Sequence, residues 1–279
     1  MTQGIVVGFD GSPLSRLAVE WAADEASLRH AELHVVTCVH HPLTGPDIDL
    51  TGDAVRVAEG TTDGDLEDLR REVRGAHPDL EVSTATRRGE ATRVLRTAGR
   101  GADLLVVGAT GRTPLSPRDL GETARSLAMR ADCDVVVVPR HVAPGRVERI
   151  VAAVDGSSRD DAVVAAAAQE ARLHRAPLAI VHCSTTPRSG EAAAVVDHAA
   201  RLLGAMPVGS VTTHVVDART IDGVLGVAEG HVVVVVGRHH SNAFTAALAG
   251  SSAVALVRHS PVPTMVVGAR GRGRGRAEA

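Results

Sequence analysis

The stretch Gly108-Ala109-Thr110-Gly111 is the most informative part of the sequence, and nine residues separate it from a further glycine, Gly121. It comes directly after the apolar run 104–107, which is typical of a buried strand, and Gly121 opens a helical run over 123–130. Glycines let backbone N–H groups approach an anion, and a helix N-terminus adds unpaired donors and a positive dipole. This strand, turn and helix therefore suit a phosphate, although one such glycine spacing is a weak signal.

The same arrangement occurs again in the second half of the chain, which makes it a much stronger signal. Gly237 follows the apolar run 232–236, and Gly250-Ser251-Ser252 lies downstream at the separation found in the first copy. Near the start, Asp10-Gly11-Ser12 is repeated as 155–157, at an offset of 145 residues (155 − 10), whereas the glycines are offset by 129 (237 − 108). We therefore predict two copies of one fold in tandem, the second shorter by 16 residues (145 − 129).

Further pairs share the 145-residue offset: Glu25 with Glu170, Leu28 with Leu173, and Cys38 with Cys183. The deletion in the second copy falls between its second strand and its glycine stretch. At this place the first copy has a polar, Gly- and Asp-rich segment, 43–64, which we predict to be a loop.

Strands and helices alternate along each copy, which predicts a parallel sheet covered by helices on both faces. The first helix is expected to start at Pro13 with Ser12 as its N-cap. We expect its inner face to carry Leu17, Trp21, Ala22 and Leu28. In the first copy the predicted strands are 4–9, 32–39, 81–86, 104–107 and 134–138, and the predicted helices are 13–29, 65–75, 93–99 and 121–130. The predicted domains are 1–141 and 147–269, followed by a basic, disordered Arg/Gly tail over 270–279.

The composition indicates a globular protein and excludes several classes of function. The chain has 279 residues, 44% hydrophobic and 23% charged, and a net charge of −3, so no basic field favours nucleic acid. Its three Cys have no paired spacing, which excludes a disulfide scaffold and a zinc site. No run is long enough to span a bilayer and the start does not resemble a signal peptide, so we expect no membrane association and a cytoplasmic location.

Asp10 and Asp155 each follow a predicted first strand at its carboxyl end, where open α/β sheets bind ligands. A carboxylate there can accept hydrogen bonds from a ribose or a base amine. Alternatively, each Asp simply starts the turn or caps the helix. The recurrence of the Asp and of the downstream glycines in both halves favours the ligand-binding role.

With Asp10 after the first strand and the pattern Gly-x2-Gly-x9-Gly from Gly108 to Gly121, the chain resembles the universal stress protein family. The resemblance covers both halves and nearly the whole chain, as in a tandem member. It implies an α/β fold with two open-sheet domains, each a five-stranded parallel sheet in the order 3-2-1-4-5. It also implies an ATP site, with or without Mg, in which the nucleoside lies near the first-strand Asp and the phosphates lie on the glycine loop and the next helix.

By the same resemblance, Val39 and its counterpart near Ser184 flank the adenine, and Gly89 borders the ribose. The residues that it assigns to nucleotide binding are Asp10, Gly11, Val39, Gly89, Gly108, Gly111, Gly121 and Thr123 in the first half, and Asp155, Gly156, Gly237, Gly250, Ser251 and Ser252 in the second.

Both copies depart from the ATP-binding pattern of the family. Where that pattern has Ser or Thr after the last Gly, the first copy has Glu122, which stabilises the helix start but repels a terminal phosphate. Thr123, one place on, partly replaces the missing hydroxyl. The second copy keeps Ser251 but has His240 in place of the second Gly, and a side chain there hinders close backbone approach.

Other patterns carry less weight. The segment 47–52 resembles the opening of a calcium loop but lacks the acidic twelfth residue, and the pairs His40-His41 and His239-His240 lack zinc spacing, so we predict no metal site. Cys38 and Cys183 are expected to be small core residues.

The preferred hypothesis is a nucleotide-binding regulatory protein that is not an enzyme, with no catalytic residues. The alternatives are a scaffold that binds partner proteins without nucleotide, and a slow ATPase or nucleotidyl transferase. The last is disfavoured because the chain has no Lys to place at a phosphate. By the family resemblance, the last strands of the halves, 135–138 and 264–267, pair into an internal pseudo-dimer. Homodimerisation of the whole chain through such edges is also predicted.

Overall fold

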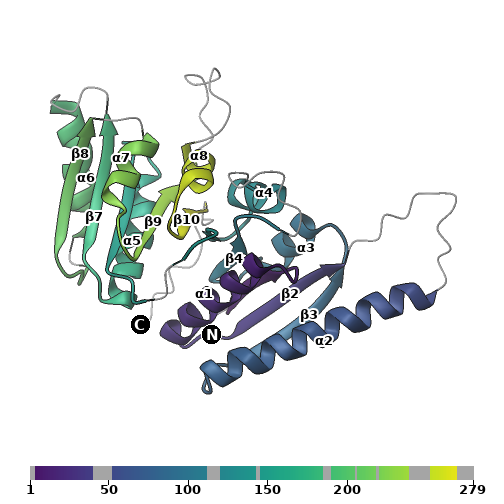
Figure 1. Cartoon of the computed structure of the whole chain (residues 1–279). Helices are drawn as coiled ribbons and strands as arrows, with labels where there is room; N and C mark the ends of the chain where they lie inside the picture. The colour runs from purple at the N-terminus through teal and green to yellow at the C-terminus, as the bar shows by residue number, and fades with distance from the viewer. Residues whose placement is uncertain are drawn as a thin grey trace, which may run out of the picture.

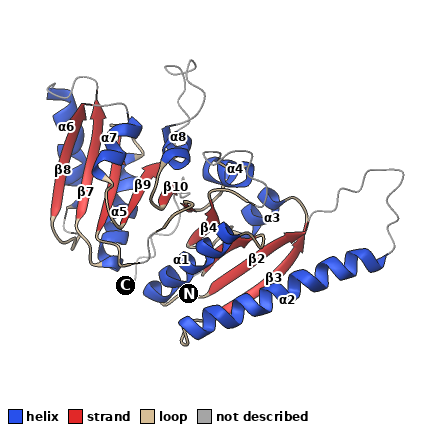
Figure 2. Ribbon diagram, in the orientation of Figure 1, coloured by secondary structure: helices blue, strands red, loops and turns tan. Residues whose placement is uncertain are grey.

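The computed structural model of the chain describes residues 4–39, 52–111, 120–142, 145–184, 190–204, 206–217, 220–238 and 252–268. Within these ranges ten strands form one continuous sheet in the order β3-β2-β1-β4-β5-β10-β9-β6-β7-β8 (Figure 1). Helices lie on both faces of the sheet (Figure 2). The α/β fold predicted from the sequence is confirmed.

Each half contributes five parallel strands in the order 3-2-1-4-5, as predicted. The first half contains β1 (Ile5–Phe9), α1 (Pro13–Arg29), β2 (Leu33–Val39), α2 (Gly52–Ala76), β3 (Val82–Arg88), α3 (Ala91–Ala98), β4 (Leu104–Gly108), α4 (Glu122–Arg130) and β5 (Val135–Val138). The second half contains β6 (Arg149–Val154), α5 (Asp160–His174), β7 (Leu178–Ser184), α6 (Gly190–Leu203), β8 (Val211–Asp217), α7 (Thr220–Val227), β9 (Val232–Gly237), α8 (Ser252–His259) and β10 (Thr264–Val267).

The two halves are joined by strands β5 and β10, which pair antiparallel with Val136 opposite Met265. Both strands are fully buried and apolar except for Thr264, so neither could be left at an open edge without exposing its backbone groups and its core side chains. The predicted internal pseudo-dimer is therefore confirmed. The strand edges that were predicted to pair with a second chain, those of β5 and β10, pair with each other within this chain.

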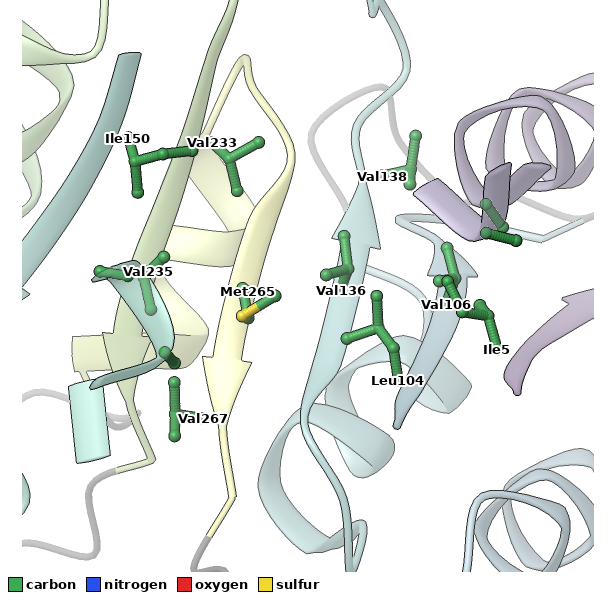
Figure 3. Close-up of a cluster of buried hydrophobic side chains, with 14 of the residues drawn as sticks. Ile5, Leu104, Val106, Val136, Val138, Ile150, Val233, Val235, Met265 and Val267 are labelled. Atoms are coloured by element: carbon green, nitrogen blue, oxygen red, sulfur yellow. The ribbon is translucent and has the colours of Figure 1, made fainter. Parts of the chain in front are cut away.

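The hydrophobic core has two layers, one on each face of the sheet, and both layers run through the two halves. One layer lies under α1, α2, α5 and α6, and the other lies under α3, α4, α7 and α8. Figure 3 shows the first layer around the junction, where Val136 of β5 faces Met265 of β10, with Leu104 and Val106 on the side of the first half and Val233 and Val235 on the side of the second. The core is thus shared across the junction.

Two expectations about the helices of the first half are wrong. Helix α2 begins at Gly52, whereas the sequence predicted a loop until residue 64. The loop was predicted because Gly and Asp favour turns. Each Gly inside a helix costs only about 1 kcal/mol relative to Ala, however, and a helix of this length can accommodate that cost. The part of the predicted loop before residue 52 lies outside the described residues.

The inner face of α1 also differs from the prediction. Ala22 is buried as expected, but Leu28 is 45% exposed, and Leu17 and Trp21 are only partly buried. The face packed on the sheet consists mainly of small residues, among them Ala18, Ala22 and Ala26. These let the helix lie close to the valine-rich strands, whereas size alone had suggested the larger apolar side chains. The N-cap was predicted correctly, because Ser12 accepts a hydrogen bond from the backbone of Ser15 at 3.1 Å.

Among the described residues, no helix has both the length and the apolar composition needed to cross a bilayer.

The junction generates a stability prediction. Met265→Ala removes a side chain that is almost fully buried where the halves meet, so it should lower the free energy of unfolding by about 2–5 kcal/mol. Leu28→Ala truncates an exposed side chain and should change it by less than about 0.5 kcal/mol. Urea denaturation followed by circular dichroism measures both, and equal effects would contradict the shared core.

Candidate functional site

Asp10 and the glycine stretch, 100 residues apart in sequence, meet at the carboxyl edge of the sheet. Strands β1 and β4 are adjacent and parallel, with Val7 opposite Val106, so the residues that follow them leave the sheet side by side. A Cβ atom added to Gly111 would lie 2.7 Å from Oδ2 of Asp10. Only glycine therefore allows the carboxylate to lie against this turn. The sequence prediction brought together the right two segments.

Asp10 also has a local structural role. Its Oδ1 accepts a hydrogen bond from the backbone N–H of Ser12 at 3.0 Å, and its own N–H donates to Oγ of Ser15. The next residue, Gly11, has φ +80°, a conformation that favours glycine, and there is open space around its Cβ position. The turn-forming role that the sequence left open is therefore present, and the second carboxylate oxygen faces Gly111.

The ends of β2 and β3 continue the same edge. Gly89, with φ +136°, donates its N–H to the carbonyl of Val39 at 3.0 Å, so these two predicted residues are in direct contact. Glu90 follows and caps α3 by accepting from the N–H groups of Thr92 and Arg93. Gly89, Val39, Asp10 and the glycine stretch thus lie at the carboxyl ends of four neighbouring strands, β3, β2, β1 and β4.

The start of α4 closes the turn after β4. The N–H of Gly121 donates to the carbonyl of Ala109 at 2.8 Å, and a Cβ on Gly108 would lie 3.1 Å from the carbonyl of Leu14. Gly121 is the N-cap of α4 and has no side chain to accept from the first N–H groups of the helix. Beside it, Thr110 is only 5% exposed, and its Oγ1 has no hydrogen-bond partner in the described part of the chain.

Glu122, the residue that departs from the family pattern, points along its own helix. Its carboxylate pairs with Arg125, one turn on, at 2.9 Å, and its side chain is 75% exposed. Thr123, the next residue, is half-buried. The negative charge at this helix start is therefore partly balanced by Arg125 and partly screened by solvent.

The second half repeats the geometry of the first turn but adds a carboxylate to it. Oδ1 of Asp155 accepts from the N–H of Ser157 at 3.0 Å, and Gly156 has φ +82°. At the position of Ser15 this half has Asp160, whose carboxylate accepts from the N–H groups of Asp155, at 3.2 Å, and of Gly156, at 2.9 Å. Burial raises the pKa of Asp160, as does the neighbouring charge of Asp155, while the two backbone hydrogen bonds lower it.

Other features also distinguish the second half. A Cβ on Gly156 would lie 3.1 Å from Val195 of α6, whereas the equivalent Gly11 meets open space. Gly237 ends β9 and packs near Val163. The predicted residues Gly250 and Ser251, and also His240, lie outside the described residues, as does the side chain of Ser252.

Arg238 stands where the first half has Ala109, and its side chain crosses to the other half. Its guanidinium donates to the carbonyls of Ala128, at 2.7 Å, of Ala131 and of Cys133, at 3.3 Å. These carbonyls lie at and beyond the C-terminus of α4, where cations are favourable. The glycine turn of the second half is thus tied to the helix whose other end adjoins the glycine turn of the first.

The cysteines are poor nucleophiles. Burial raises the pKa of Cys38 to about 11, with a smaller contribution from Glu90, and burial is also the main cause that raises the pKa of Cys133 to about 11. Burial raises the pKa of Cys183 as well. Cys133 is buried, whereas Cys38 and Cys183 are half-buried at the ends of their strands, less enclosed than expected.

Sequence reasoning missed three residues of these sites. Asp160 could have been found, because the 145-residue offset aligns it with Ser15. Arg238 and Thr110 were visible within the glycine stretches, but nothing local signals that one crosses between halves or that the other is buried without a partner.

Comparison with known proteins gives the same family for both halves. The model of the universal stress protein family matches residues 1–139 and 146–268. A universal stress protein of Mycobacterium tuberculosis is 31% identical over 176 residues, an alignment that spans 62% of this chain and 62% of that protein's own length. One from Mycobacterium bovis is 28% identical over 299 residues, or 94% of each chain. The crystal structure of a universal stress protein from Archaeoglobus fulgidus, 17% identical, covers 95% of this chain and 96% of its own with a TM-score of 0.76, which supports the fold.

The crossing of Arg238 predicts a stability effect. Arg238→Met leaves buried carbonyl groups without a donor, so the free energy of unfolding should fall by about 1–3 kcal/mol. Arg71→Met removes an exposed pair with Asp68 on α2 and should have an effect within about 0.5 kcal/mol. Urea denaturation measures both variants; an Arg238 variant as stable as the control would show that the cap contributes nothing.

Proposed function

The chain belongs to the universal stress protein family, and from this premise we propose that it binds ATP in its first half and acts as a regulatory protein without catalysis. The observation that carries the proposal is the meeting of Asp10 with Gly111 beside the uncapped start of α4. A carboxylate suited to a ribose or base amine and backbone donors suited to phosphate are thereby placed on one edge of the sheet.

Thr110 supports a ligand at this turn. A buried hydroxyl without a hydrogen-bond partner costs roughly 1–3 kcal/mol, and native proteins leave few such groups. A bound phosphate would accept from a hydroxyl at this position. The donors assigned to phosphate are the backbone N–H groups of Gly111 and of the first turn of α4 and the hydroxyl of Thr123, since the N–H of Gly121 donates to Ala109. The residues assigned to adenosine are Asp10, Val39 and Gly89.

The first half is proposed in preference to the second because of three differences. The second turn holds the additional carboxylate of Asp160 next to Asp155, and this charge disfavours a polyanionic ligand. Val195 packs against Gly156, where the first half has open space at Gly11. Arg238, which follows Gly237, donates to carbonyls of the first half.

The side chains at the first turn favour a regulatory role over catalysis of phosphoryl transfer. The chain has no Lys, and among the described residues this turn presents the carboxylates of Asp10 and Glu122 and glycines but no Lys or His as a partner, so phosphoryl transfer lacks its usual charged groups there. ATP would instead order the turn and shift an equilibrium between two conformations by its difference in affinity for them.

A scaffold that binds partner proteins without nucleotide is the second candidate function. It is favoured by Glu122, whose carboxylate stands where a terminal phosphate would come closest to α4. Cytoplasmic location and homodimerisation of the whole chain also stay predictions. Because β5 and β10 pair with each other, a second chain would have to use another surface.

The first test of nucleotide binding uses equivalent residues of the two halves. Asp10→Asn keeps an oxygen that can accept from Ser12 and removes the charge that faces Gly111, so we expect at least tenfold weaker binding of Mg·ATP. Asp155→Asn is the matched control and should leave both the affinity and a stoichiometry of one ATP per chain unchanged. Isothermal titration calorimetry gives both numbers. If Asp155→Asn alone weakens binding, the site lies in the second half.

The second test concerns the charge at the start of α4. Glu122→Ser removes a unit charge and restores a hydroxyl, and two like charges about 4–5 Å apart in water repel by about 1 kcal/mol, so ATP should bind roughly fivefold more tightly. Glu122→Gln removes the charge alone and separates the two contributions. If neither Asp10→Asn nor the Glu122 variants change the measured affinity, ATP does not bind at this turn; if the folded protein gives no binding heat at all, the scaffold is the better function.

A further inference from the structure

Four charged or titratable side chains form a buried cluster between the two halves. Glu25 and Arg29 come from α1, and Glu170 and His174 come from α5. Each pair is spaced i, i+4, and the 145-residue offset relates Glu25 to Glu170 and Arg29 to His174. Their side chains are 1%, 9%, 4% and 8% exposed, respectively. We refer to them as the four-residue cluster.

The contacts in the cluster cross from one half to the other. Nη2 of Arg29 lies 2.7 Å from Oε1 of Glu25 and 2.5 Å from Oε1 of Glu170. Nε2 of His174 lies 3.1 Å from Oε2 of Glu25 and 3.8 Å from Oε2 of Glu170. Each carboxylate therefore has the guanidinium on one oxygen and the imidazole near the other.

The charges of the cluster do not balance without a proton. Two carboxylates and one guanidinium leave one negative charge in excess, and an uncompensated charge is costly to bury. A single proton on the imidazole or on a carboxylate removes this excess. Burial, together with the charge of Glu25, raises the pKa of Glu170 to about 8. Burial opposes ionisation of Glu25 as well, but the hydrogen bond with His174 and the charge of Arg29 outweigh it and lower its pKa to about 2.

Among the described residues, the charges that act most strongly on the cluster are those of its own members. The groups whose charges and hydrogen bonds shift the pKa values of Glu25, Arg29 and Glu170 are the other members of the cluster. Of the elements that pack against α1 or α5, strands β1, β4, β5, β9 and β10 contain no titratable side chain, whereas β2, β6, β7 and α6 do, among them His34, Arg149, His182 and Asp197. None of these residues is a main cause of the pKa shifts of the cluster. Nearby, Arg146 donates to the backbone carbonyl of His174, and Asp24, next to Glu25, lies 3.4 Å from His77.

We propose that the four-residue cluster is a pH-sensitive contact between the two halves, in which one proton, shared among His174 and the two glutamates, holds α1 against α5. When that proton leaves at alkaline pH, the excess negative charge is buried at the contact and the two helices separate more easily. The pairing of β5 with β10 is independent of the proton, so the halves stay joined while the helix contact weakens.

A bound metal ion is a less suitable explanation of the cluster. The oxygen and nitrogen atoms of Glu25, Glu170 and His174 lie within 4.8 Å of one another, close enough for a shared ion. The buried guanidinium of Arg29, however, already contacts both carboxylates. A divalent cation would have to displace it, whereas a proton need not.

The direction of the pH dependence follows from the two pKa shifts. Glu170 keeps in the folded state a proton that the unfolded chain releases above the ordinary glutamate pKa of 4.5, so its contribution to stability is lost as pH rises from there to about 8. Glu25 is ionised in the folded state down to about pH 2, so its contribution is lost as pH falls from 4.5 towards that value. The weakening that we propose is therefore the alkaline one.

The experiment measures the thermal midpoint of the full chain between pH 6 and pH 9, by circular dichroism and by the emission of Trp21, the one Trp of the sequence, which lies one turn before Glu25 on α1. The wild-type midpoint should fall by about 2–4 °C per pH unit up to about pH 8. Glu170→Gln removes the excess charge, so its midpoint should not fall between pH 6 and pH 8, below the pH at which the buried thiols begin to contribute. Glu20→Gln, an exposed change on α1, is the matched control and should behave as the wild type does.

Hydrogen exchange on the unmodified protein keeps the proposal testable if Glu170→Gln does not fold. After correction for the intrinsic effect of pH, α1 and α5 should lose protection between pH 7 and pH 9, while β5 and β10 keep theirs. Midpoints of wild type and Glu170→Gln that fall in parallel, or unchanged protection of both helices, would overturn the proposal. A midpoint that ZnCl2 raises in the wild type but not in His174→Gln would do so as well, in favour of a metal site.

Discussion

The antiparallel pairing of β5 with β10 is the contact on which the rest of the structure depends. A parallel sheet built from one half alone would end in a strand of buried valines with unpaired backbone groups. Pairing with the last strand of the other half satisfies those groups and makes one sheet of ten strands. It also sets the position of everything above the sheet, because α1 then meets α5 on one face and α4 meets α8 on the other.

At this junction the two copies differ in the side chains that they contribute and in the roles of those side chains. In two identical chains, every residue near the axis would have to serve both halves equally. In a tandem chain the two copies can differ, and here they do: Asp160 of the second copy stands at the position of Ser15, and Arg238 of the second copy caps α4 of the first. These side chains stabilise the second turn and the junction. The open turn with Asp10 and Gly111 is found in the first copy.

The sequence predicts the features that the two halves repeat, and it misses the side-chain contacts that depend on how the halves pack. Alternating strands and helices, the offset of Asp155 from Asp10 and the valine-rich strands were sufficient for the α/β fold and the tandem repeat, because these depend on local pattern and on the repeat. The strand order was predicted from the resemblance to the universal stress protein family. The contact of Asp10 with Gly111 follows from the order of the strands. The crossing of Arg238 and the small-residue face of α1 do not, since both are decided by what packs opposite them once β5 and β10 have paired.

The four-residue cluster is a consequence of the same geometry. Equivalent residues of two copies meet near a pseudo-twofold axis, so Glu25 faces its own counterpart Glu170. With an Arg in both copies, each carboxylate would have a guanidinium and the buried charges would cancel. The second copy has His174 at the position of Arg29, and imidazole carries a positive charge only when it is protonated. The difference between the copies at this one position makes the charge of the contact depend on a single proton.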